Sequence, residues 1–160
     1  MLRPYLLPAV FLLATTVGTA DAQRSAVVSV SAKVDGKTYD ATGAGSCRHS
    51  PTAAIHNVPA ALWLVQHTGS GRGAIKRLNL TFWRPKDGSP ERFSLAVKSR
   101  SSSHRIDVGG RGKPVGSGKA ALSLKGTGGR FEIKGKDDSG TPIEVIIKCP
   151  AFGGIEAEGG

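Results

Sequence analysis

The stretch PIEVIIKC, residues Pro142 to Cys149, decides the fold class because every second position along it is apolar. Ile143, Val145, Ile147 and Cys149 occupy every second position, so in an extended chain their side chains project from one face. Alternation with this period predicts a β-strand that turns one face toward a core. We therefore expect Cys149 to point into the core at the end of a strand.

The same period of two recurs in short segments along the chain, and turn residues separate these segments. Asp35-Gly36 is one such turn, because glycine accepts the positive φ of a tight hairpin. The sequence predicts an all-β fold, a single antiparallel sandwich or partly closed barrel of about seven to nine strands. The clearest strands are expected at Val28–Val34, Lys37–Thr42, Leu78–Phe82, Phe93–Val97, Ala120–Leu124, Phe131–Ile133 and Pro142–Cys149, and a weaker, short strand is expected at Ile106–Val108.

The segment Ala60–Val65, AALWLV, is apolar at every position and does not alternate. Such a run is typical of a strand buried on both faces or of a short helix. Asn57 and Pro59 precede it at spacings compatible with a helix start, but its short length favours a strand.

Residues 1–22 are predicted to be an export signal. Arg3 gives a positive start, the run Leu6–Ala14 is apolar, and Ala20-Asp21-Ala22 provides a cleavage site after Ala22. The apolar run is shorter than the roughly 20 residues that cross a bilayer, and no other segment is long enough. We expect a periplasmic or secreted protein with a β domain at residues 23–150 and a loosely attached, glycine-rich tail at residues 151–160.

Cys47 and Cys149 are the two cysteines of the chain. Exported proteins meet an oxidising environment, in which paired thiols normally form disulfides. A nucleophilic cysteine needs an adjacent base and a structural zinc site needs four ligands, usually in close pairs, and neither is visible here. The sequence therefore predicts a Cys47–Cys149 disulfide.

The segments that lead to the two cysteines also carry a family resemblance. VDGK (residues 34–37), followed by Thr42-Gly43 and Cys47, and Ile143-Glu144-Val145 before Cys149 resemble the mycobacterial lipoprotein antigen family. The resemblance implies a small secreted β protein with one disulfide, exposed at the cell envelope and without known catalytic residues. The chain lacks the lipid-bearing cysteine of that family and is more basic, so the resemblance does not extend to surface anchoring.

The formal net charge is +10, and much of the excess positive charge lies between Arg72 and Lys113, a stretch that contains eleven Lys or Arg and three acidic residues. Such a field attracts anions, for example lipopolysaccharide phosphates or acidic glycans, although charged strands also serve solubility and discourage edge pairing. The candidate anion-binding residues are Arg72, Lys76, Arg77, Arg84, Arg92, Lys98, Arg100, Arg105, Arg111 and Lys113. Of these, the strand pattern places Lys76, Arg84, Arg92 and Lys98 on an outward face.

Trp83 is the candidate residue for contact with a protein partner. It shares a face with Asn79 and Thr81, opposite the apolar positions of the same strand, so we expect it to be exposed. Dedicated nucleic-acid binding is not expected, because most phenylalanines fall at core positions and none is spaced for base stacking.

Nothing in the sequence predicts an enzyme. A catalytic triad could in principle be composed of a serine from Ser101–Ser103, His104 and Asp107. However, a serine run followed directly by histidine does not place a base next to a nucleophile. His49, His56 and His67 would form a metal site only if loops brought them together, so no metal and no cofactor are expected.

The sequence therefore predicts an exported, non-enzymatic envelope or secreted protein that acts as a structural or protein-interaction module. The alternative is a module that binds anionic envelope polymers through a basic surface.

Overall fold

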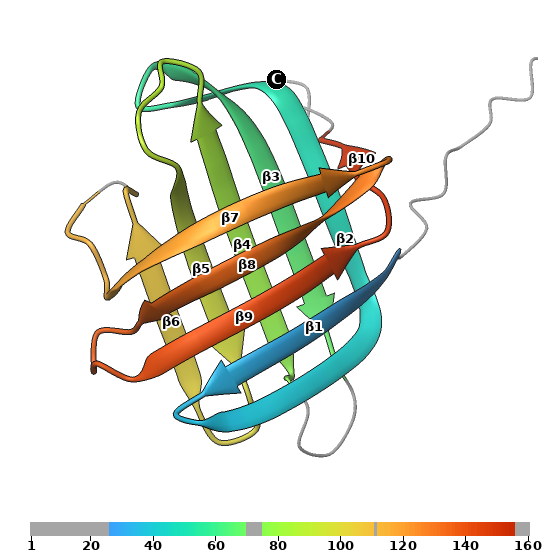
Figure 1. The fold of residues 1–160 in the computed structure, drawn as a ribbon, viewed down its shortest axis with the longest axis vertical. Helices are drawn as coiled ribbons and strands as arrows, with labels where there is room; N and C mark the ends of the chain where they lie inside the picture. Colours follow the sequence, from blue (N-terminus) through green and yellow to red (C-terminus); the bar gives the residue numbers. More distant parts are fainter. Residues whose placement is uncertain (1–25, 70–74, 111, 156–160) are drawn as a thin grey trace, which may run out of the picture.

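The computed structural model describes residues 26–69, 75–110 and 112–155, and it confirms the all-β prediction (Figure 1). The strands of this part of the chain are β1 (Ala26–Val34), β2 (Lys37–Ile55), β3 (Val58–Thr68), β4 (Arg77–Pro85), β5 (Arg92–Lys98), β6 (Ser103–Val108), β7 (Ser117–Lys125), β8 (Gly128–Lys136), β9 (Pro142–Cys149) and β10 (Gly153–Gly154). Within these residues there is no helix long and apolar enough to cross a membrane. The predicted export signal, residues 1–22, lies outside the described residues.

The first nine strands form one sheet in the order β6-β5-β4-β3-β2-β1-β9-β8-β7, with antiparallel neighbours throughout. The sheet curls so that β7, β8, β9 and β1 form one layer that crosses over β3 to β6 (Figure 1). Its two ends meet where Asp107 and Val115 exchange backbone hydrogen bonds of 2.8 and 3.1 Å. The sheet is therefore nearly closed and barrel-like.

Two tight hairpin turns begin and end the long strand β2. Asp35 and Gly36, with φ of 48° and 77°, connect β1 to β2 as predicted. His56 and Asn57, with φ of 49° and 66°, connect β2 to β3. This second turn contains no glycine, and Asn tolerates the left-handed region, so the alternation pattern does not reveal it.

β2 extends well beyond the predicted segment Lys37–Thr42 and passes from one layer of the sheet to the other (Figure 1). Gly45 lies in the middle part of β2, where the strand packs closely between β1 and β3. A Cβ at Gly45 would overlap the carbonyl oxygen of Gln66 on β3 and come within 2.8 Å of Cγ2 of Val28 on β1. The absence of a side chain at this position lets the strands approach closely.

The segment Ala60–Val65 lies within β3, so the strand prediction is confirmed and the helix alternative is wrong. Trp63 and Val65 point into the core, whereas Leu62 and Leu64 lie half-buried on the opposite face. The continuous apolar run thus reflects a strand with apolar side chains on both faces.

Side chains fill the space between the layers. The largest buried ones are Phe82, Phe93 and Phe131, each 1% exposed or less. Cys47 and Cys149, also buried, form the predicted disulfide, which joins β2 to the end of β9 across 102 residues.

The chain after Cys149 differs from the expected loose tail over the residues that the structure describes. Phe152 donates a backbone hydrogen bond of 2.8 Å to Thr127 and packs against Phe131, with ring centroids 6.1 Å apart. β10 then pairs in parallel with Arg48 and His49 of β2.

Candidate functional site

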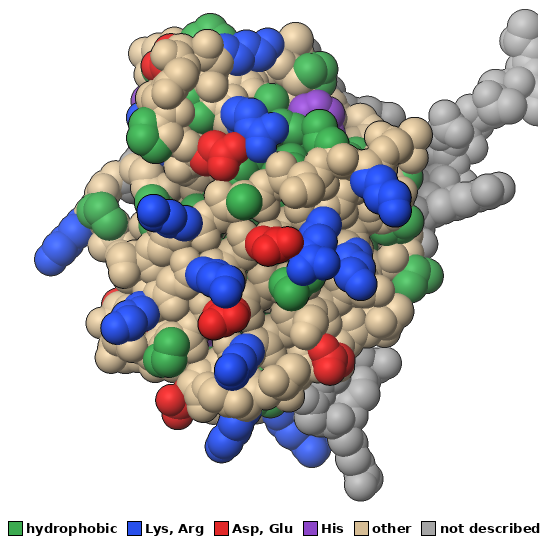
Figure 2. Space-filling model, in the orientation of Figure 1, with side chains coloured by type: hydrophobic (Ala, Val, Ile, Leu, Met, Phe, Trp, Pro, Cys, Tyr) green, Lys and Arg blue, Asp and Glu red, His purple; other side chains and the backbone are tan. Residues whose placement is uncertain are grey.

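The outer face of β1, β7, β8 and β9 carries a high density of basic side chains, which Figure 2 shows spread over this layer. These four strands contain seven Lys or Arg and only two acidic residues. All seven basic residues are exposed, because they occupy the outward positions of strands whose alternate residues form the core. We call this surface the cationic face, and its basic residues are Lys33, Lys119, Lys125, Arg130, Lys134, Lys136 and Lys148.

Sheet register arranges these charges in rows. Lys33 lies opposite Glu144, Glu144 opposite Lys134, and Lys134 opposite Lys119, across four neighbouring strands. Directly paired positions in antiparallel strands are about 5 Å apart between Cβ atoms, so each row presents charges at short and regular intervals. The two rows that contain Lys134 and Arg130 are four residues apart along β8.

The two glutamates neutralise only part of this charge. Glu144 pairs with Lys134 at 3.5 Å, and Glu132 pairs with Arg130 at 2.9 Å. Among the described residues, the other five basic side chains of the cationic face form no ion pair. A surplus of five positive charges is therefore exposed on one side of the protein.

The predicted anion-binding residues do not form one patch. Arg77 and Lys98 are register partners on the outer face of β4 and β5, and Arg105 lies on the same face of β6. Arg100 occupies the turn that joins β5 to β6, so these four lie near one another. The pairing of Arg105 with Asp107 at 3.0 Å neutralises one of the four charges. We call Arg77, Lys98, Arg100 and Arg105 the second cationic cluster.

The remaining predicted residues lie elsewhere. Lys76 precedes β4 and donates its backbone N–H to Lys98 at 2.7 Å. Arg92 is half-buried and reaches the carbonyl oxygen of Gly109 at 3.5 Å. Lys113 is exposed between β6 and β7. Arg72 and Arg111 lie outside the described residues.

The expectation that Arg84 points outward is wrong. Its guanidinium carbon lies 5.5 Å from the ring centroid of Trp63 and 5.8 Å from that of Phe82, both of which are core residues. Its Nε donates to Glu91 Oε1 at 2.6 Å, and its Nη2 donates to the carbonyl oxygen of Leu122 at 3.4 Å. Arg84 follows Phe82 by two residues, so it continues the inward row of β4 and covers one end of the core.

Trp83 lies on the outer face of β4, as predicted, but it is half-buried. Its register partners are Leu62 on β3 and Arg92 on β5. Leu62 and Leu64 are also half-buried on this outer face, so Trp83 belongs to a small apolar area with a guanidinium beside it.

The three histidines of the metal hypothesis do not converge. His49 stacks on Trp63 with ring centroids 4.3 Å apart, and His56 lies at the exposed β2–β3 turn. His67 is 1% exposed, its ring nitrogens have no hydrogen-bond partner among the described residues, and burial lowers its pKa. In the described part of the chain no cluster of three or more His, Cys, Asp or Glu could hold a metal ion.

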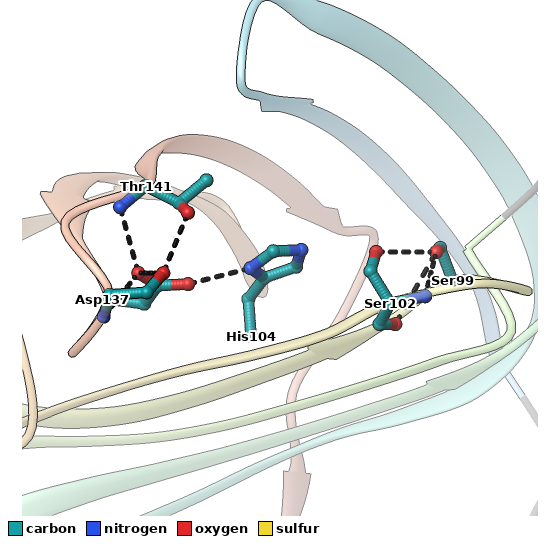
Figure 3. A network of polar contacts seen from close by, with 6 residues as sticks. Ser99, Ser102, His104, Asp137 and Thr141 are labelled. Atoms are coloured by element: carbon teal, nitrogen blue, oxygen red, sulfur yellow. Dashed lines mark hydrogen bonds and ion pairs between the residues drawn. The ribbon is translucent and has the colours of Figure 1, made fainter.

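A polar cluster that the sequence did not predict joins β6 to the turn between β8 and β9 (Figure 3). His104 Nδ1 lies 2.7 Å from Asp137 Oδ2, and both side chains are largely buried. Asp137 Oδ1 accepts hydrogen bonds from the N–H groups of Ser139 and Thr141 and from the Ser139 hydroxyl. The sequence pattern had instead offered Asp107 as a partner for His104.

The described hydrogen bonds of Ser99 and Ser102 do not include the ring of His104. Ser99 and Ser102 bond to each other at 2.8 Å, and Figure 3 shows no bond from either of them to His104. A nucleophile needs such a contact with its base. The contact between His104 and Asp137 joins β6, at one end of the sheet, to the β8–β9 turn, and we call this pair the clasp.

The comparisons with known proteins identify no relative, since no protein-family model, curated protein or solved structure matches the chain.

Proposed function

We propose that this protein is a non-enzymatic module that binds anionic polymers of the cell envelope, with the cationic face as its binding surface. The observation that carries the proposal is the excess of seven basic over two acidic residues on the exposed face of β1, β7, β8 and β9. A surface with several unpaired cations suits an extended ligand with repeated negative charges, such as a lipopolysaccharide core or an acidic glycan.

Export supports the same proposal. A buried disulfide is typical of proteins that fold outside the reducing cytosol, and residues 1–22 have the pattern of an export signal. The resemblance of the two cysteine segments to an envelope antigen family points in the same direction. We place the protein in the periplasm or outside the cell, where anionic polymers are abundant.

Contact with a protein partner is the second candidate function, and the half-buried pair Leu62 and Trp83 favours it. Aromatic and aliphatic side chains beside an arginine are frequent at the centres of interfaces. Such an apolar contact would depend little on ionic strength, whereas polymer binding to the cationic face would weaken steeply with salt.

A comparison of two triple variants tests the proposed function. Lys33→Gln, Lys119→Gln and Lys134→Gln remove three charges from one row of the cationic face. Arg77→Gln, Lys98→Gln and Arg105→Gln remove three charges from the second cationic cluster and serve as the matched control. Binding of purified lipopolysaccharide and of a polyuronate is measured by fluorescence anisotropy from 25 to 300 mM NaCl.

We expect the first variant to weaken binding by about tenfold or more at low salt and to reduce the salt dependence, because fewer counterions are released. The control variant should retain most of the affinity. Equal losses in both variants would show only a general charge effect, and no loss in the first would refute the cationic face as the site.

A further inference from the structure

At one corner of the cationic face the surface is hollowed. The hollow lies where the β7–β8 turn packs against the end of β9, and its volume is about 980 Å³. This volume is within the usual range of small-molecule sites, although the hollow is open to solvent. Figure 2 shows basic side chains and hydrophobic side chains close together at this side of the layer.

The charged part of the lining is entirely basic. Lys125, Arg130 and Lys148 line the hollow, and no acidic side chain does so among the described residues. Lys125 and Lys148 form no ion pair among the described residues. Arg130 pairs with Glu132 through its Nε, so its two terminal nitrogens can contact a ligand. Arg130 and Lys148 are register partners on β8 and β9, so their charges converge. The hydroxyl of Thr127 adds a hydrogen-bond donor at the rim.

An unusual apolar surface accompanies these cations. Leu124 lines the hollow with 59% of its surface exposed. Val27, which is 61% exposed, stands two residues before Ser29, and Ser29 is the register partner of Lys148. Val27 and Leu124 are the large hydrophobic residues of the described chain that are exposed, and of the two Leu124 lines the hollow together with Lys148. An exposed aliphatic side chain beside clustered cations complements a ligand that is both anionic and apolar.

The walls of the hollow are held in place. Cys149 belongs to the lining and is bonded to Cys47, and the backbone N–H of Phe152 donates to the carbonyl oxygen of Thr127 at 2.8 Å. A Cβ at Gly128 would overlap the carbonyl oxygens of Cys149 and Pro150, so the turn lies directly against the end of β9. A preformed site loses little ordering entropy when a ligand binds.

We propose that this hollow binds an anionic amphiphile, a phosphate monoester or diester attached to an aliphatic chain, with Lys125, Arg130 and Lys148 on the phosphate and Leu124 on the chain. The inference rests on the proposed function, because the hollow is part of the cationic face. It goes further by naming a small ligand, such as the phosphorylated lipid end of an envelope polymer. Both a lipid and a free phosphate would engage the three cations, but only the lipid would engage Leu124.

Calorimetric titrations of the purified protein with three probes separate these contributions. Dodecyl phosphate, below its micellar concentration, offers both parts of the ligand. Methyl phosphate offers the anion alone, and dodecyl maltoside offers the chain alone. We expect one molecule of dodecyl phosphate per chain, bound at least about tenfold tighter than either of the other probes, because burial of methylene groups adds to the charge contact.

Three variants locate the site. Leu124→Ser should weaken dodecyl phosphate binding by about tenfold and leave methyl phosphate and the polymer probes unchanged. Lys148→Gln should weaken both phosphates, and Lys119→Gln, on the same face but outside the hollow, should weaken neither. Thermal melting checks that each variant remains folded, which is expected because all three side chains are exposed.

Equal affinity for methyl and dodecyl phosphate, or no effect of Leu124→Ser, would overturn the proposal and leave a simple anion site or no site. The result is separable from the proposed function. If polymer binding is absent while dodecyl phosphate binding depends on Leu124, the hollow stands without the polymer surface. If the polymer binds and dodecyl phosphate does not, only the hollow is refuted.

Discussion

Asp137 is the buried acid of the described chain, and its surroundings strongly favour the charged form. Burial by itself would raise its pKa, but hydrogen bonds from His104, Ser139 and Thr141 outweigh that effect and lower the pKa from 3.8 to about 2. The unfolded chain binds a proton more readily than the folded protein does, so the carboxylate stabilises the fold above the unfolded pKa. The contribution is about 2 kcal/mol at neutral pH, and it is lost as pH falls from about 4 through about 2.

Replacement of Asp137 should therefore be costly and pH-dependent. We expect Asp137→Ala to lower the free energy of unfolding by about 3 kcal/mol at pH 7, since it leaves His104 and two backbone N–H groups without their acceptor. The loss should shrink below pH 4, where the wild-type carboxylate itself begins to protonate. Urea unfolding from pH 2 to 7 measures this. Asp138→Ala, at the exposed neighbouring position, should change stability by less than about 0.5 kcal/mol, and equal effects of the two variants would contradict the clasp.

At the scale of the element, β2 shows how one strand can belong to both layers of a curled sheet. It pairs with β1 in its first half and with β3 in its second half, and the strand bends between these partners. Its register with β3 shifts between Ser50 and Ala53, where Pro51 offers no N–H to the ladder. Gly45 belongs to both pairings, opposite Ala26 on one side and His67 on the other.

A side chain at Gly45 should disrupt this bend. We expect Gly45→Ala to destabilise the protein by about 2–4 kcal/mol, because the new Cβ would overlap the backbone of β3 and press on Val28. Gly154→Ala is the matched control, since nothing lies within 4 Å of a Cβ there. The midpoint of thermal unfolding should fall by several degrees for the first variant and stay within about one degree for the control. An unchanged midpoint for Gly45→Ala would mean that β2 can shift away from β3.

The strands that the sequence predicted are those in which local pattern and burial agree. β1, β5 and β9 have a clean apolar inner face with mostly polar residues opposite, so the period of two was sufficient. The second half of β2 was missed because a strand that bends around a corner changes its partners, and its residues are mostly half-buried with no clear alternation. The hairpin at His56 and Asn57 was missed for lack of glycine.

The candidate site was harder to predict because basic residues that are clustered in the sequence need not be clustered in space. The stretch from Arg72 to Lys113 is rich in basic residues, yet its strands point them in several directions, and Arg84 lies over the rings of Trp63 and Phe82 at one end of the core. The cationic face gathers residues as distant as Lys33 and Lys148, which only the pairing of β1 with β9 brings together. Marking outward positions on every predicted strand would have shown the excess on β7, β8 and β9, but not that these strands form one layer with β1.

At the scale of the whole molecule, the single sheet depends on the pairing of β1 with β9, two strands that are far apart in the sequence. β1 is the first described strand, and it pairs with β9 through six residues from Ser29 to Val34. The other neighbours among the first nine strands are consecutive in sequence, so bringing them together costs little chain entropy. The pairing of β1 with β9 has the largest cost in conformational entropy, because it closes a loop that contains the seven strands between them. The disulfide lies beside this junction and ties β2 to the end of β9.

Removal of the disulfide should therefore destabilise the fold without abolishing it. We expect Cys47→Ala with Cys149→Ala to lower the free energy of unfolding by about 2–5 kcal/mol, because the cross-link that closes this loop of 102 residues no longer restricts the unfolded chain. The pairing of β1 with β9 remains, so the far-ultraviolet circular dichroism spectrum should keep its β character. Urea unfolding of the variant, and of the native protein with and without a thiol reductant, measures the loss. An unchanged midpoint on reduction would show that the sheet closes independently of the bond, and a fully unfolded variant would show that strand pairing alone cannot hold the two ends together.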